Sequence, residues 1–142
     1  MKSPIHYVYL LALMLACLCL LLTASLSAQD APRSPLATAQ AQLDAYNAQD
    51  VDAFAAVFAE NALVYSRLGD TLPSMQGREQ IRERYAALFA EYPDNYSTLT
   101  GRLVQGNFVM DHEYLTGRGE PVSIIAIYEV EDGEIVRCWF VR

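Results

Sequence analysis

Lysine and histidine are almost absent from this chain of 142 residues. Lys2 is the only lysine, and His6 and His112 are the only histidines. Lys2 and His6 both fall in an N-terminal stretch with the features of a removable leader, so the rest of the chain holds one histidine and no lysine. Catalysis through a lysine Schiff base is therefore excluded there. A side chain that titrates near neutral pH has to be His112, or a carboxylic acid whose pKa is strongly shifted.

Cysteine is scarce as well. Cys17 and Cys19 lie in the same N-terminal stretch, so only Cys138 remains beyond it and no disulfide can form within the rest of the chain. The fold must then be held together by packing, even in an oxidising compartment. Cys138 has no neighbouring base in the sequence, and we expect it to be a small core residue.

Basic residues are outnumbered by acidic ones. The formal net charge is −7 at pH 7, and the arginines are scattered without forming a basic run. Proteins that bind nucleic acids usually carry a basic patch or stripe, and so do proteins that lie on anionic membranes. We therefore expect no nucleic-acid partner, and contact with a membrane only through the N-terminal segment.

The N-terminal segment is an apolar run from Ile5 to Leu22, preceded by Lys2 and followed by small and polar residues up to Ala28. A basic start, an apolar middle and a small-residue exit are typical of a secretory signal peptide. We predict a signal peptide over residues 1–27 and export to the periplasm or the medium. An uncleaved anchor is the alternative, because the run approaches the ~20 residues that cross a bilayer.

The remaining chain is long enough for one domain with one core. Residues 28–34 are expected to be a flexible lead, and residues 35–142 the domain. Ser34 and Pro35 favour a helix over 35–48, Asp50 can cap a shorter helix that Glu60 and Asn61 close, and Gly77 precedes a helix over 78–92. Alternating apolar residues predict strands at 62–67, 72–76, 96–104, 107–118, 122–130 and 135–141.

This order of elements predicts an α+β fold in which three N-terminal helices pack on one face of a curved, mainly antiparallel sheet. The strand over 122–130 is apolar on both faces, with Ile124, Ala126 and Tyr128 on one side and Ile125 and Ile127 on the other. A strand of this kind needs cover on both faces. The helices can supply one cover, and we expect a second copy of the chain to supply the other in a homodimer.

Four sequence runs, at 58–64, 77–81, 106–113 and 127–135, together resemble the nuclear transport factor 2-like superfamily, and within it the SnoaL-like branch. The resemblance implies a cone-shaped α+β barrel whose mostly apolar pocket, between helices and sheet, binds a small hydrophobic molecule. It also implies a dimer in many cases. It says little about activity, because this fold serves isomerases, cyclases, hydrolases and proteins without enzymatic activity.

The resemblance extends to steroid Δ-isomerase-like proteins. Ketosteroid isomerase uses an aspartate base, with a tyrosine and a protonated aspartic acid as hydrogen-bond donors. The matching positions here are Ser66 for the base, Ala126 for the acid and Gln42 for the tyrosine, with Tyr46 one helical turn away. Serine cannot remove a carbon-bound proton unaided and alanine donates nothing, so ketosteroid isomerase chemistry by that route is not expected.

The run Asp111-His112-Glu113 is the remaining candidate for catalysis. His112 is either a general acid/base or a half-buried histidine bonded to a cross-strand neighbour. Asp111 and Glu113 point to the opposite face of a regular strand, so they could support His112 only indirectly. Asp111 and Glu113 share one strand face, so they could form a carboxylate pair for acid/base work or for a cation. The alternative for them is a solvated face, or salt bridges to Arg102 and Arg118 on neighbouring strands. Two acids and one histidine without a second cluster are a weak metal signal, and no metal or cofactor is expected.

Aromatic and arginine side chains are the candidates for lining the pocket. Arg67 either binds an anionic group of a ligand or pairs with Asp70. The other candidates can offer hydroxyl or indole donors, or can serve ordinary packing: Tyr46, Tyr65, Tyr96, Tyr128 and Trp139. The sequence thus predicts an exported small-molecule-binding protein. The alternatives are an isomerase or hydrolase that acts on a small apolar carbonyl compound through His112, and a dimeric protein-interaction module.

Overall fold

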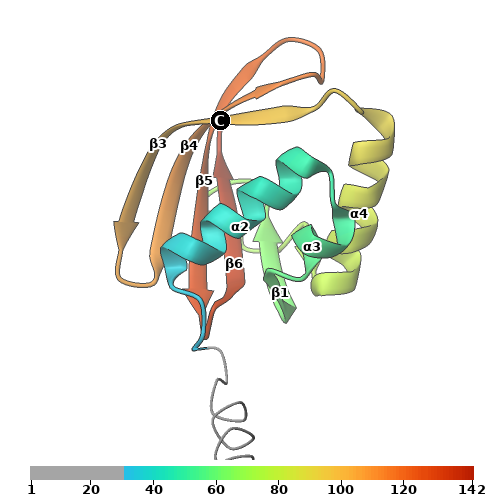
Figure 1. Cartoon of the computed structure of the whole chain (residues 1–142). Coiled ribbons are helices and arrows are strands. Elements are labelled where there is room, and N and C mark those ends of the chain that lie inside the picture. The colour runs from blue at the N-terminus through green and yellow to red at the C-terminus, as the bar shows by residue number, and fades with distance from the viewer. Residues whose placement is uncertain (1–30) are drawn as a thin grey trace, which may run out of the picture. The chain divides into compact units, whose positions relative to one another are not determined.

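Six strands form one mixed sheet in the order β2-β1-β6-β5-β4-β3 (Figure 1). Neighbouring strands are antiparallel except β1 and β6, which run parallel. The computed structural model describes residues 31–142, so the predicted signal peptide and residues 28–30 of the predicted flexible lead lie outside the described residues. The strands are β1 Phe58–Tyr65, β2 Met75–Gln76, β3 Tyr96–Gln105, β4 Phe108–Thr116, β5 Val122–Glu131 and β6 Glu134–Val141.

Three helices cover one face of this sheet: α2 Pro35–Ala48, α3 Val51–Ala55 and α4 Arg78–Glu91. The Ser34 hydroxyl caps α2 by accepting a hydrogen bond from the Ala37 amide, and the Asp50 carboxylate caps α3 in the same way. Helix α2 lies across β3 to β6, whereas α4 packs on α3, β1 and β2 (Figure 1). No helix among the described residues is both long and apolar enough to span a membrane.

The α+β class and the mainly antiparallel sheet agree with the prediction. Only α2 and α3 precede the first strand, because α4 follows β2. The prediction that the second helix continues to Glu60 and Asn61 is wrong, since α3 ends at Ala55 and β1 starts at Phe58. Pairing across the sheet explains this: Phe58 lies opposite Ile135, whose amide donates to the Val57 carbonyl over 2.8 Å. Ile135 lies 77 positions after Phe58 in the sequence, so no local signal reveals this pairing.

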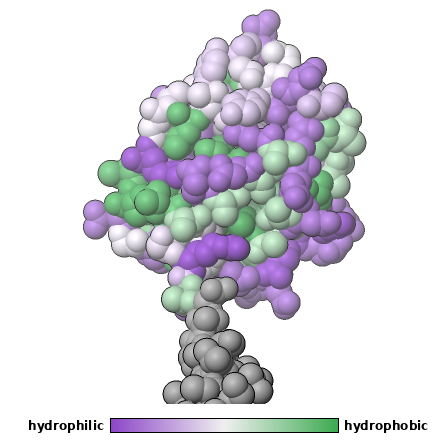
Figure 2. All heavy atoms as spheres, in the orientation of Figure 1, coloured by the Kyte–Doolittle hydropathy of each residue, from purple (hydrophilic) through white to green (hydrophobic). Residues whose placement is uncertain are grey.

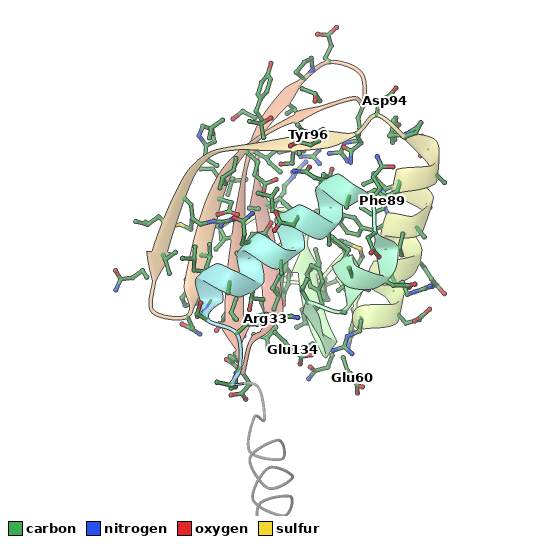
Figure 3. All side chains as sticks on the ribbon, viewed as in Figure 1. Arg33, Glu60, Phe89, Asp94, Tyr96 and Glu134 are labelled. Carbon is green, nitrogen blue, oxygen red and sulfur yellow. The ribbon has the colours of Figure 1, made fainter. Side chains whose placement is uncertain are left out.

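The core lies between the helices and the sheet. An aromatic cluster fills it beside α3 and α4, where the Phe54 and Tyr85 rings lie 4.1 Å apart and Phe89 points from α4 toward α2 (Figure 3). Tyr46 packs edge-on against Phe89 from α2. Cys138 is buried among these residues, as predicted.

The opposite face of the sheet is also apolar. Tyr65 and Trp139 stack there with ring centroids 5.6 Å apart, and the register continues the row across neighbouring strands through Ile127, Met110 and Leu103. At the far edge of the sheet, Figure 2 shows apolar side chains gathered over β3. None of the three helices covers this face, because they pack on the other one.

Candidate functional site

A pocket of about 780 Å³ opens between the helices and the sheet, and we call it the helix–sheet pocket. Its walls come from α2, α4, β2, β4, β5, the end of β6 and the segments that follow β1 and β4. Apolar side chains make up much of the wall, chiefly Leu88, Leu115, Ile124 and Phe140. The polar groups that line its inner part are Gln42 and Tyr46 from α2, Tyr85 from α4, Glu113 from β4 and Tyr128 from β5.

Glu113 is the one carboxylic acid in the lining of the helix–sheet pocket. Strand alternation turns Val109, Asp111, Glu113 and Leu115 toward the helices, and Glu113 is only 6% exposed. Burial raises the pKa of Glu113, because the charged form loses its hydration; hydrogen bonds from Ser97 and Tyr128 oppose this rise in part. Such a residue can keep its proton closer to neutral pH than an exposed glutamate.

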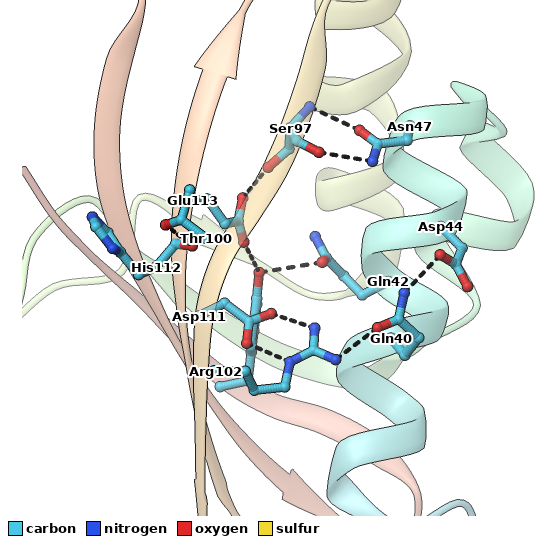
Figure 4. A network of polar contacts seen from close by, with 11 residues as sticks. Gln40, Gln42, Asp44, Asn47, Ser97, Thr100, Arg102, Asp111, His112 and Glu113 are labelled. Atoms are coloured by element: carbon cyan, nitrogen blue, oxygen red, sulfur yellow. Dashed lines mark hydrogen bonds and ion pairs between the residues drawn. The ribbon is translucent and has the colours of Figure 1, made fainter.

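The Ser97 hydroxyl donates a hydrogen bond to Glu113 Oε2 over 2.6 Å (Figure 4). Ser97 is itself fixed to α2, because its amide donates to Asn47 Oδ1 over 2.8 Å and its carbonyl accepts from Asn47 Nδ2 over 2.9 Å. The orientation of the Glu113 carboxyl group therefore depends on the docking of α2 onto β3.

The Tyr128 hydroxyl lies between two acceptors, 3.2 Å from Gln42 Oε1 and 3.3 Å from Glu113 Oε1 (Figure 4). A hydroxyl group has one proton to donate but can also accept. If the Glu113 carboxyl group carries a proton, it can donate that proton to the Tyr128 hydroxyl, and Tyr128 can donate its own to Gln42. Each of these three side chains then has a hydrogen-bond partner. The arrangement therefore suits a neutral Glu113. The pKa of Tyr128 is also raised by burial.

Asp111 does not line the pocket, although it shares the face of Glu113. Both of its oxygens accept hydrogen bonds of 2.6 Å from Arg102, and its side chain is fully buried (Figure 4). Arg102 also donates to Gln40 on α2 over 2.7 Å. The predicted salt bridge between Asp111 and Arg102 is thus confirmed, whereas the prediction that Asp111 and Glu113 form a solvated face is wrong.

His112 points away from the helix–sheet pocket. Figure 4 shows the His112 ring on the side of β4 away from α2. Its side chain is exposed, and its Nε2 atom lies 2.7 Å from the Ser123 hydroxyl on the neighbouring strand. Of the two predictions for His112, this contact agrees with the second, in which the histidine is bonded to a neighbour on the next strand. The expected half-burial of His112 is wrong, because its face of β4 is the outer one. The geometry gives no support to His112 as a general acid/base for a ligand in this pocket.

The remaining candidates divide into two groups. Tyr46, Arg67 and Tyr128 line the helix–sheet pocket, whereas Tyr65, Trp139 and Tyr96 do not. Tyr65 and Trp139 stack on the outer face, and Tyr96 is 51% exposed at the start of β3 (Figure 3).

Tyr46 is held in the pocket wall by a hydrogen bond. Its hydroxyl donates to Asn95 over 2.8 Å, and burial raises its pKa. Arg67 is bonded to Asp70 through its backbone only: its amide donates to Asp70 Oδ2 over 2.9 Å, and its carbonyl accepts from the Asp70 amide over 3.3 Å. Within the described residues its guanidinium forms no ion pair with Asp70.

Sequence reasoning missed several lining residues. Ser66 and Gln42, which occupy the ketosteroid isomerase base and tyrosine positions, both line the pocket, whereas Ala126 is buried outside it. Tyr85, Arg84 and Arg118 also line it and were not predicted to do so.

The residues described hold no group of three or more histidine, cysteine, aspartate or glutamate side chains that could bind a metal ion. The site thus contains one carboxylic acid, Glu113, inside the pocket, with hydroxyl and amide groups beside it. A carboxylic acid in such surroundings can hold or transfer one proton.

Comparison with known proteins places this geometry in a family. A family model described as the SnoaL-like domain matches residues 39–138. No curated protein matches the sequence. Among solved structures, an uncharacterized cystatin-fold protein from Novosphingobium aromaticivorans is 32% identical with a TM-score of 0.71, over 78% of this chain and 99% of that one.

Two further structures are similar over most of their length. A candidate ketosteroid isomerase from Kribbella flavida is 26% identical with a TM-score of 0.63, over 75% of both chains. A candidate polyketide cyclase from Sinorhizobium meliloti is 24% identical with a TM-score of 0.64, over 73% of this chain and 93% of that one. With the fold, the pocket and a family model that covers residues 39–138 in agreement, this chain belongs to the SnoaL-like domain family.

Proposed function

We propose that this protein binds a small, mainly apolar molecule in the helix–sheet pocket. The observation that carries the proposal is the pocket itself: about 780 Å³, with walls of Leu88, Leu115, Ile124 and Phe140 and a few convergent polar groups. Ligand sites for small molecules are typically concave, apolar and of this size, with a small number of polar groups that orient the ligand.

Blocking the pocket tests this proposal. Ser66 is an exposed residue in the pocket lining, so Ser66→Trp places a large ring at the opening without disturbing the core. Thr98→Trp is the matched control, because Thr98 is exposed on β3 and does not line the pocket. Binding of a panel of apolar fluorescent probes should be lost in Ser66→Trp and kept in Thr98→Trp. Equal binding in both variants would contradict the proposal.

A second candidate function is an isomerase that moves a proton on a carbonyl compound, with Glu113 in the role first considered for His112. The buried carboxylic acid in the pocket wall favours it, as does the similarity to a candidate ketosteroid isomerase at 26% identity. Ionised Glu113 would take a proton from the carbon next to the carbonyl group and return it to another carbon of the same molecule. Because Ser66 and Ala126 stand at the ketosteroid isomerase base and acid positions, the reaction would need a different placement of its groups.

Glu113→Gln separates the two candidates. Glutamine keeps the size and an acceptor oxygen but cannot take up a proton in this way, so an isomerase would lose turnover of enones while ligand binding persisted. Tyr114→Phe is the matched control, because Tyr114 is the neighbouring residue on the outer face. Turnover that survives Glu113→Gln would exclude Glu113 as the catalytic group.

Export is part of the proposal, and it is supported by the composition of the N-terminal segment. Expression of the complete sequence in a bacterial host should deliver the protein to the periplasm, with its mass reduced to that of a chain starting at Ala28 or Gln29. Protein that stays with the membrane at full mass would favour the uncleaved anchor, and protein found in the cytoplasm would contradict export.

A homodimer is also proposed, through the apolar outer face of the sheet. Leu103 is 56% exposed, and Met110, Ile127, Trp139 and Tyr65 continue the same row. Contiguous apolar side chains that are open to solvent commonly mark association surfaces. A second copy of the same sheet would cover a row that one copy leaves open.

A further inference from the structure

Arginines gather around the helix–sheet pocket. Arg67, Arg84, Arg118 and Arg142 all line it, although the chain contains only 10 basic residues and carries a net charge of −7. They come from four separate places: the segment after β1, helix α4, the turn after β4 and the end of β6. The fold therefore concentrates positive charge at one opening of an otherwise acidic protein.

These four arginines differ from four others outside the pocket in their partners. Arg78, Arg82, Arg102 and Arg137 each form an ion pair, with Glu134, Asp52, Asp111 and Glu129 respectively. Within residues 31–142, none of the four pocket arginines has a carboxylate within ion-pairing distance. The paired arginines serve the structure of the domain, whereas the pocket arginines have guanidinium groups available for another anion.

The only carboxylic acid in the lining does not neutralise them. Glu113 sits on the sheet between Ser97 and Tyr128, hydrogen-bonded to both, and it forms no ion pair with Arg118. Arg118 is half-buried, and its charge acts on the hydroxyl groups of Tyr46 and Tyr85, lowering their pKa against the effect of burial. Its charge thus reaches into the part of the pocket that a ligand would occupy.

From this charge arrangement we propose that the ligand of the helix–sheet pocket is an organic anion, with an apolar body and one carboxylate group. The inference rests on the proposed binding function and narrows it to a class of ligand. The apolar body lies against Leu88, Leu115 and Ile124. The carboxylate faces Arg118, with Arg67 nearer the solvent. Guanidinium groups bind carboxylates through paired hydrogen bonds, and a cluster of them also draws an anion toward the opening.

The test uses two pairs of probes that differ in charge and hardly in shape: 1-naphthaleneacetate with 1-naphthaleneacetamide, and decanoate with decanamide. Protein expressed from the complete sequence is titrated with each probe at pH 7 and low salt by calorimetry. We expect each carboxylate to bind at least tenfold tighter than its amide. Added salt should weaken the carboxylates only, because the outer arginines are exposed and their charges are screened.

Three variants locate the effect. Arg118→Gln and Arg67→Gln should each weaken carboxylate binding threefold or more and leave amide binding unchanged. Arg33→Gln is the matched control, because Arg33 is an exposed arginine that neither lines the pocket nor forms an ion pair within the described residues. Arg33→Gln should change neither the binding of the carboxylates nor the binding of the amides.

The possible failures are distinguishable. Amides that bind as tightly as carboxylates, or an Arg118→Gln variant that weakens both alike, would overturn the anion inference and leave the binding function standing. Failure of all four probes to bind at millimolar concentration would overturn the binding function together with the inference.

Discussion

The Tyr128 hydroxyl oxygen lies 3.3 Å from Glu113 Oε1, inside the helix–sheet pocket. This side-chain contact adds to the backbone pairing of β5 with β4, and it places a carboxylic acid beside a hydroxyl group whose pKa burial has raised. Burial disfavours the charged forms of both groups, so it raises the pKa of Glu113 and that of Tyr128.

The first prediction concerns the pH dependence of stability. Burial holds the pKa of Glu113 above its ordinary value of 4.5, so the folded protein binds this proton more tightly than the unfolded chain does. The stabilisation is complete below pH 4.5 and is lost as the pH rises toward the pKa of the folded state. In Glu113→Gln this loss cannot occur. The free energy of unfolding of the wild type, relative to that of the variant, should therefore fall between pH 4 and pH 8 in urea denaturation, and a difference that rises with pH would be contradictory.

The second prediction concerns the buried ion pair. Asp111→Asn leaves Arg102, whose side chain is 11% exposed, without its charged partner, which should cost about 3–5 kcal/mol of unfolding free energy. The matched control is Asp52→Asn, which breaks the exposed pair with Arg82 and should have little effect. Chemical denaturation of both variants checks this. Equal losses would show that the Asp111–Arg102 pair contributes no more than a surface pair does.

The third prediction concerns the turn that carries Arg118. Gly117 has a φ of +79°, and a Cβ atom added there would lie 2.0 Å from the Asp94 carbonyl oxygen. Gly117→Ala must therefore move the backbone of either segment. Gly69 has a φ of +92° but no atom within 4 Å of an added Cβ, so Gly69→Ala should cost only the backbone strain, about 1–2 kcal/mol. Thermal unfolding should show the larger loss for Gly117→Ala, and the reverse order would contradict the close approach.

The fourth prediction concerns the outer face of the sheet. If two copies associate through this face, Leu103→Asp places a charge in the interface and should convert the dimer into a monomer at high micromolar concentration. Leu72→Asp is the control, because Leu72 is 80% exposed in the segment between β1 and β2. Light scattering measures both. A wild-type protein that is monomeric at these concentrations would refute the dimer itself.

Local sequence signals predicted much of this fold correctly. Ser34-Pro35 and Asp50 mark helix starts where the structure has them, and the Asp132-Gly133 turn joins β5 to β6 as expected. The start of β1 was missed, because Val57 and Phe58 continue the apolar spacing of a helix. Their strand partners in β6 lie far away in the sequence, and no local pattern reveals them.

The candidate site was harder to predict for a related reason. Strand β4 alternates between one set containing Phe108, His112 and Tyr114 and another containing Val109 and Glu113, and either set could face the helices by composition. The structure turns the more aromatic set outward, which removes His112 from the pocket and brings Glu113 into it. The choice depends on Arg102, which neutralises Asp111 from β3 and makes its burial possible.

A crystal structure of the protein with 1-naphthaleneacetate bound tests the central claim most directly, because it shows where a small molecule lies. The account predicts the naphthalene ring between α2, α4 and β4, against Leu115 and Ile124, with the carboxylate near Arg118. A ligand found only on the outer face of the sheet, or an unoccupied helix–sheet pocket at saturating concentration, would contradict it.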